Sequence, residues 1–168
     1  ELSDIDFHTA RTPVERREMD ALAVVCKSAD LDRALFLTYA VVLLNADGDA
    51  MAKAHAPYSR FPVGAALRTE DGRVFAGCNI ENASFPEGWC AETTALGHYV
   101  MGGGGRITEI AVIAEKMPRV TPCGGCRQRL AEFAGPEAKL HLCDETGVVD
   151  TLTMGEILPL GFAGETLR

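Results

Sequence analysis

Three cysteines and one glutamate in this sequence have the spacing of a metal centre. Cys123 and Cys126 form a Cys-x-x-Cys pair, and two thiolates at this spacing can bind one metal ion. Cys90, far upstream of the pair, can supply a third thiolate. Three protein ligands leave a tetrahedral zinc ion with one open position for water, which is the arrangement of catalytic zinc sites.

Glu92 follows Cys90 by two residues, near the start of a predicted helix. Zinc lowers the pKa of bound water from about 15.7 to about 7, and a neighbouring carboxylate can pass the released proton to a substrate. We therefore predict that Glu92 is a proton shuttle. A carboxylate is also favoured at a helix N-terminus for electrostatic reasons alone, so this position by itself does not establish the role.

Other roles for the cysteines are less well supported by the sequence. A redox dithiol typically has a Trp-Cys-Gly-Pro-Cys context, whereas Cys123 follows Thr-Pro. Free cysteines are also often small buried core residues. A structural zinc site needs a fourth ligand, and neither Cys78 nor Cys143 belongs to a second Cys-x-x-Cys pair. The pattern therefore favours a catalytic site.

The predicted elements place these cysteines at helix starts. Helices are expected at residues 90–101 and from Pro122 to Gly135, and earlier ones at 14–29 and 30–44, the last ending at the Asn45–Gly48 stop. Strands are expected at residues 63–69, 73–80, 107–114 and 139–143, with a further candidate at 148–151. The first two strands form a hairpin through the Asp71-Gly72 turn. Strands separated by helices predict parallel pairing, so the fold class is α/β with a mixed sheet.

Composition excludes two classes of partner. The formal net charge is −8, which repels a phosphate backbone, so nucleic acid is a poor substrate candidate. The longest nearly uncharged run, residues 34–44, is about half the roughly 20 residues needed to cross a bilayer. We therefore expect a soluble, cytoplasmic protein that binds neither nucleic acid nor membrane.

The sequence resembles the small, homotetrameric type of cytidine deaminase. The similarity rests on four blocks, which occur in the family's order: APYSRFPVGAAL from Ala56, GCNIENASFPEGWCAE from Gly77, TPCGGCRQRLAEF from Thr121 and GEILPLGF from Gly155. The resemblance implies a three-layer αβα fold around a central mixed five-stranded sheet. It also implies a deaminase domain at residues 46–168, preceded by an additional helical segment at 1–45 of unknown role.

The resemblance implies the chemistry of the site as well. Zn²⁺ is held by Cys90, Cys123 and Cys126, and Glu92 protonates N3 while zinc-bound hydroxide attacks C4 of the cytosine ring. Ammonia leaves, and cytidine becomes uridine, a reaction of pyrimidine salvage. Deoxycytidine is expected to react too, because a contact with the 3′-hydroxyl does not test the 2′ position.

Other positions match substrate-binding residues of the family. Asn79 and Glu81 correspond to residues that bind the ribose, with the Glu81 carboxylate accepting from the 3′-hydroxyl. Phe61 corresponds to an aromatic that packs against the nucleoside, and the Ala91 backbone to one that reads the base edge. Turn polarity is the less favoured alternative for the polar pair, and core packing explains Phe61 better when that residue is considered alone.

Three aromatic positions imply that the site is completed by oligomerisation. Phe162 corresponds to a residue that reaches into a neighbouring subunit's pocket, and Tyr58 and Phe85 correspond to positions near subunit contacts. The resemblance thus implies a homotetramer with sites shared between subunits, acting on a small nucleoside.

The sequence departs from the family pattern at Thr93, where an arginine commonly offsets the negative charge of the three thiolates. Without compensation the metal is a weaker Lewis acid, and Arg127 is one candidate to supply the missing charge. Two alternatives therefore stay open: deamination of another aminopyrimidine nucleoside such as blasticidin S, and a homologue that binds nucleosides without turnover. The extra front segment gives a separate expectation, that deleting residues 1–29 alters assembly or solubility before it alters the zinc site.

Overall fold

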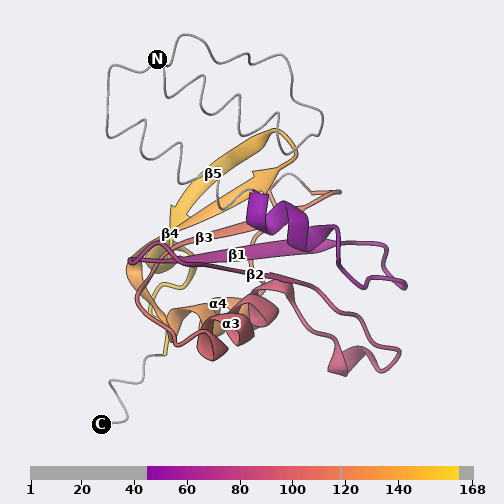
Figure 1. Ribbon diagram of the computed structural model, residues 1–168, viewed down its shortest axis with the longest axis horizontal. Helices are drawn as coiled ribbons and strands as arrows, with labels where there is room; N and C mark the ends of the chain where they lie inside the picture. Colours follow the sequence, from indigo (N-terminus) through magenta and orange to yellow (C-terminus); the bar gives the residue numbers. More distant parts are fainter. Residues whose placement is uncertain (1–44, 118, 163–168) are drawn as a thin grey trace.

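The computed structural model describes residues 45–117 and 119–162 (Figure 1). The helices expected at residues 14–29 and 30–44 lie outside the described residues. Residues 45–51 are helical, so the helix stop predicted at Asn45–Gly48 is wrong. This helical segment packs against the sheet, and Asp47 within it is fully buried, so tertiary contact overrides the local stop signal.

The centre of the molecule is a mixed five-stranded sheet with the order β2-β1-β3-β4-β5. The strands are β1 (Val63–Thr69), β2 (Val74–Cys78), β3 (Ile107–Ala114), β4 (Ala134–Asp144) and β5 (Gly147–Thr153). Only the β3–β4 pair is parallel, and the other three pairs are antiparallel. The predicted α/β class with a mixed sheet is confirmed.

The predicted boundaries differ most after the Cys-x-x-Cys pair. The helix expected from Pro122 to Gly135 is the shorter α4 (Gly124–Ala131), and β4 already begins at Ala134. There, Ala134 pairs with Ile107, and the register shifts before regular pairing resumes at Lys139. Pairing with β3, a contact distant in sequence, therefore sets the start of the strand.

The predicted hairpin between β1 and β2 is present, although β2 is shorter than the expected 73–80. Gly72 in its turn has a φ of 85°, which suits glycine because most side chains avoid this region. The candidate strand at 148–151 is the middle of β5, which pairs with β4. The last described helix is α5 (Met154–Ile157), which begins with a capping box between Thr153 and Glu156.

Helices cover both faces of the sheet, as the three-layer prediction requires. Figure 1 shows α3 (Ala91–Met101) and α4 together on one side, and the helix at residues 45–51 on the other. The main core lies under α3 and α4, where buried side chains of β1, β3 and β4 meet both helices. No helix in the described ranges is long and apolar enough to span a membrane.

Two glycines allow helices to approach the sheet closely on its two faces. A Cβ on Gly64 in β1 would lie 1.9 Å from the carbonyl oxygen of Asp47. A Cβ on Gly77 in β2 would lie 2.3 Å from the backbone nitrogen of Ala95 in α3. Gly77 therefore fixes how near the first turns of α3, which follow Cys90, lie to the sheet.

Candidate functional site

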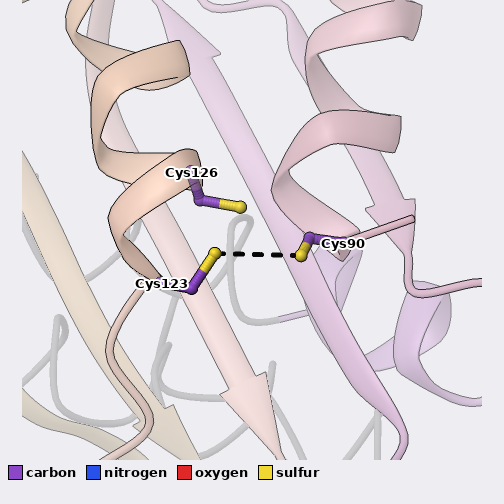
Figure 2. A group of neighbouring side chains, drawn as sticks. All are labelled: Cys90, Cys123 and Cys126. Atoms are coloured by element: carbon purple, nitrogen blue, oxygen red, sulfur yellow. Dashed lines mark hydrogen bonds between the residues drawn. The ribbon is translucent and has the colours of Figure 1, made fainter. Parts of the chain in front are cut away.

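The three predicted ligands converge where α3 and α4 begin. Cys90 is the N-cap of α3, Cys123 is the N-cap of α4, and Cys126 lies in the first turn of α4. Neither N-cap side chain bonds to its own helix, and Figure 2 shows all three side chains pointing into the space between the helices. The positive ends of both helix dipoles favour thiolates at these positions.

The sulfur positions fit a zinc ion. The three Sγ atoms lie within 4.8 Å of one another, and those of Cys90 and Cys123 are 4.0 Å apart. Tetrahedral zinc with Zn–S bonds of about 2.3 Å holds its sulfurs about 3.8 Å apart, so small side-chain adjustments suffice. Three thiolates also suit the preference of zinc for sulfur ligands.

The two other cysteines of the described chain lie outside this group. The thiol of Cys78 donates to the carbonyl of Lys53, and the buried Cys143 donates to the carbonyl of His141. Within residues 45–117 and 119–162 the ligand group therefore has three members. This supports the catalytic type of zinc site over a four-cysteine structural site.

Glu92 is buried beside the sulfurs, with 4% of its surface exposed. The Cys126 thiol donates to Oε2 of Glu92 over 3.3 Å. Hydrogen bonding with Cys90 and burial raise the pKa of Cys126. The neighbouring Cys126 side chain lowers the pKa of Cys90 to about 6, helped by Cys123 and the positive charge of Arg129, against the opposing effects of burial and Glu92. Of these two cysteines, Cys90 therefore loses its proton more readily.

The structure places Thr93 at the sulfurs and turns Arg127 away from them. The Thr93 hydroxyl lies 3.9 Å from the Cys126 sulfur. Arg127 instead donates to the carbonyls of Pro122, over 2.9 Å, and Ile157, over 3.0 Å. Arg127, the candidate counter-charge predicted from the sequence, therefore connects α4 to neighbouring backbone.

A cavity of about 380 Å³ opens beside the ligands, within the range of about 300–1,000 Å³ typical of small-molecule sites. Cys90, Ala91, Glu92 and Cys123 line one side of it, and Asn79 and Glu81 belong to the same lining. Six of the nine predicted site residues therefore line this one cavity.

Asn79 and Glu81 hold the loop that precedes β1. The Asn79 amide accepts from the backbone N–H of Val63 over 2.8 Å and donates to the carbonyl of Phe61 over 3.0 Å. Glu81 accepts from the backbone N–H of Tyr58 over 2.8 Å and from the hydroxyl of Ser59. The Ser59 and Tyr58 hydrogen bonds lower the pKa of Glu81, so its carboxylate is charged at neutral pH.

Phe61 and Phe162 do not line this cavity. Phe61 is partly buried, and its backbone carries the contact with Asn79. Phe162 is 62% exposed, and its carbonyl accepts from the Gln128 side chain over 2.8 Å. The roles predicted for these two aromatics stay predictions.

Sequence reasoning missed two residues near the site. Trp89 is part of its lining and half exposed, and Ser59 supplies the hydroxyl that Glu81 accepts. Both lie inside the quoted sequence blocks, so their place beside Cys90 and in the PYS segment was the available signal. The Ser59 contact joins residues 22 positions apart, which local patterns do not reveal.

Comparisons with known proteins agree with this geometry. The family model for the cytidine and deoxycytidylate deaminase zinc-binding region matches residues 43–141. A cytidine deaminase of Sporosarcina psychrophila is 42% identical over 70% of this chain and 87% of its own length. One of Halalkalibacterium halodurans is 44% identical over 68% of this chain and 87% of its own length.

Solved structures lead to the same family. The crystal structure of cytidine deaminase from Burkholderia pseudomallei is 43% identical, with a TM-score of 0.68 over 72% of this chain and 97% of that chain. The enzyme from Mycobacterium tuberculosis is 38% identical, with a TM-score of 0.65 over 72% of this chain and 94% of that chain. With a matching family model, matching relatives and three converging cysteines, this chain belongs to the cytidine and deoxycytidylate deaminase family and carries its zinc-binding domain.

Proposed function

We propose that this protein removes the 4-amino group of cytidine and deoxycytidine by hydrolysis. The products are uridine or deoxyuridine, and ammonia. The observation that carries the proposal is the buried Glu92 carboxylate, 3.3 Å from the sulfur of Cys126 at the side of the cavity. A carboxylate in this position can reach both a metal ion among the sulfurs and a ring placed in the cavity.

Cys90, Cys123 and Cys126 are proposed to hold the zinc. When bound, zinc supplies a Lewis acid that makes water a nucleophile near neutral pH. Glu92 would accept one proton from the attacking water and donate it to N3 of the pyrimidine. It would then accept the second proton, from the hydroxyl formed at C4, and donate it to the departing amino group, so that ammonia leaves and the C4 carbonyl forms. Its present partner, the Cys126 thiol, loses its proton when metal binds, which frees the carboxylate for this work.

The other predicted site residues are proposed to bind the nucleoside. Asn79 and Glu81 line the cavity and each side chain retains capacity for a further hydrogen bond, which suits the ribose hydroxyls. The backbone at Ala91, in the same lining, contacts the base. Phe61 packs against the nucleoside in this proposal, which requires its side chain to be closer to the cavity when substrate is bound.

Activity and metal content together test the proposal. Loss of cytidine is followed by ultraviolet absorbance, and zinc is quantified in the same sample. We expect one zinc per chain and a kcat that falls about 10²–10⁴-fold in Glu92→Gln, with zinc content unchanged. Glu87→Gln, on the exposed 3-10 helix η2 (Phe85–Glu87), is the matched control and retains activity. Stoichiometric zinc without turnover of any aminopyrimidine nucleoside would leave a binding protein and reject the enzyme.

The single tryptophan of the chain offers a separate measurement of binding. Trp89 lines the cavity, so cytidine added to the Glu92→Gln variant should change its fluorescence in a saturable way. Comparison of cytidine, deoxycytidine and blasticidin S in this titration ranks the substrate classes independently of turnover. Saturable binding of blasticidin S alone would contradict the proposed substrate.

We further propose a homotetramer whose sites are shared between subunits, located in the cytoplasm. The exposed aromatics support it. Tyr58 and Phe85 form an edge-to-face pair in a neighbouring hollow, which Glu81 also lines, and Phe162 is exposed near the end of the described chain. Residues 46–168 are the proposed catalytic domain, with 1–45 as an additional segment. Light scattering after size-exclusion chromatography measures the assembly, and an active monomer would contradict shared sites.

A further inference from the structure

The proposed zinc site has an excess of negative charge. Three thiolates around a divalent ion leave one net negative charge, and the Glu92 carboxylate lies beside Cys126. Glu92 is almost completely buried, so water screens this charge poorly. A cation near the sulfurs would stabilise the metal-bound state.

The neighbours of the sulfurs considered so far do not supply that cation. Thr93, which lies 3.9 Å from the Cys126 sulfur, has a neutral hydroxyl. Arg127 is occupied by the carbonyls of Pro122 and Ile157. The two helix N-termini contribute partial positive charge only.

Arg129 lies one helical turn after Cys126, and therefore on the same side of α4. Its Nη1 atom lies 2.9 Å from the position that a Cβ on Gly125 would occupy. The guanidinium thus folds back over the first turn of α4, where Gly125 separates two of the ligands, instead of extending into solvent. Arg129 and Thr93 also line one hollow between α3 and α4.

The guanidinium of Arg129 makes no hydrogen bond or ion pair within the described residues, so nothing there competes for its charge. The absence of a side chain on Gly125 provides the space that it occupies.

We propose that Arg129 is a positioning residue of the metal centre, whose positive charge offsets the three thiolates in place of a cation at position 93. The inference rests on the proposed zinc site and deepens it. Arg129 acts through the ligands and does not contact the substrate. Arg129 on α4 thus supplies the charge that the neutral Thr93 on α3 does not.

Zinc affinity of the full chain tests this role without relying on activity. The dissociation constant for Zn²⁺ is measured by competition with a chromogenic chelator, at low ionic strength and near 1 M salt. We expect Arg129→Gln to weaken binding about 10-fold at low salt, the lower end of the range for groups that support metal ligands. The difference should shrink at high salt, where the Debye length is about 3 Å, and Arg129→Lys should keep most of the affinity.

Two further variants separate charge from packing. Arg106→Gln removes the same charge from an exposed ion pair with Glu137, beyond the end of α3 farthest from Cys90, and should leave zinc affinity unchanged. Thr93→Arg in the Arg129→Gln background should restore affinity, because it returns a cation to the same hollow.

The outcomes are distinguishable. Absence of zinc from the unmodified protein would overturn the proposed function itself. Stoichiometric zinc in the unmodified protein, with Arg129→Gln no weaker than Arg106→Gln, would overturn only the role of Arg129. A loss that is equal at both salt concentrations, or that neither lysine nor Thr93→Arg recovers, would likewise assign Arg129 to packing and reject the proposal.

Discussion

Replacing Gly77 by alanine tests how β2 positions the metal centre. The added Cβ would lie 2.3 Å from the nitrogen of Ala95 and 2.7 Å from the carbonyl oxygen of Ala91, whereas ordinary contact begins at 3.4 Å. Both obstructing atoms belong to the backbone, so no side-chain rotation relieves the clash. The helix α3 must therefore move about 1 Å away from the sheet.

This displacement has two expected consequences. Overpacking of a dense interior costs about 1–3 kcal/mol of unfolding free energy, which lowers the melting temperature by about 2–4 °C for each kcal/mol in a chain of this size. The shift also moves Cys90 and Glu92 relative to the ligands on α4. Misplacement of reacting groups by about 1 Å can reduce turnover about 10²-fold.

The assay combines thermal unfolding with zinc content and kcat for cytidine. Gly97→Ala is the matched control, since a Cβ at Gly97, on the exposed side of the same helix, meets nothing within 4 Å. It should keep activity and gain about 0.5–1 kcal/mol, because alanine is favoured over glycine inside a helix. A Gly77→Ala protein with unchanged melting temperature and turnover would refute the close contact between β2 and α3.

Three further predictions concern charge and thiol chemistry. In the otherwise unmodified protein, Thr93→Arg should shift the acid limb of the pH–rate profile to lower pH, because a cation beside the Cys126 sulfur strengthens the metal as a Lewis acid. An unchanged acid limb would contradict this. The lowered pKa of Glu81 means that its contacts contribute stability above the ordinary carboxyl pKa and lose it as the pH falls through the lowered value. An NMR titration should show this pKa rising in Ser59→Ala, and a value already at the ordinary carboxyl pKa in the unmodified protein would count against the hydrogen bonds. Chelation of zinc should expose Cys123 to alkylation, while Cys143, which is buried and has a raised pKa, stays unmodified. Mass spectrometry of the labelled peptides measures the modification of each cysteine. Equal labelling of both cysteines would contradict the fold.

Much of the candidate site followed from local sequence. Cys90 and Cys123 were expected at helix starts and are N-caps, and a residue two positions into the first turn, such as Glu92, is then necessarily close to its own N-cap. The hairpin around Gly72 and the strand at 107–114 were likewise local, because turn chemistry and a run of apolar residues determine them. These features depend on neighbours within a few positions.

The sequence by itself thus determined the order of the elements, the ligand types and the helix starts. Only the tertiary structure decided that the helix continues past Gly48, that β4 begins at Ala134, and that Arg127 faces backbone carbonyls while Arg129 folds over the ligand turn. Each of these depends on contacts between segments distant in sequence or on the direction of one side chain. Such contacts are selected by the packing of the whole domain, because local preferences of about 1 kcal/mol or less are readily overcome by burial and strand pairing.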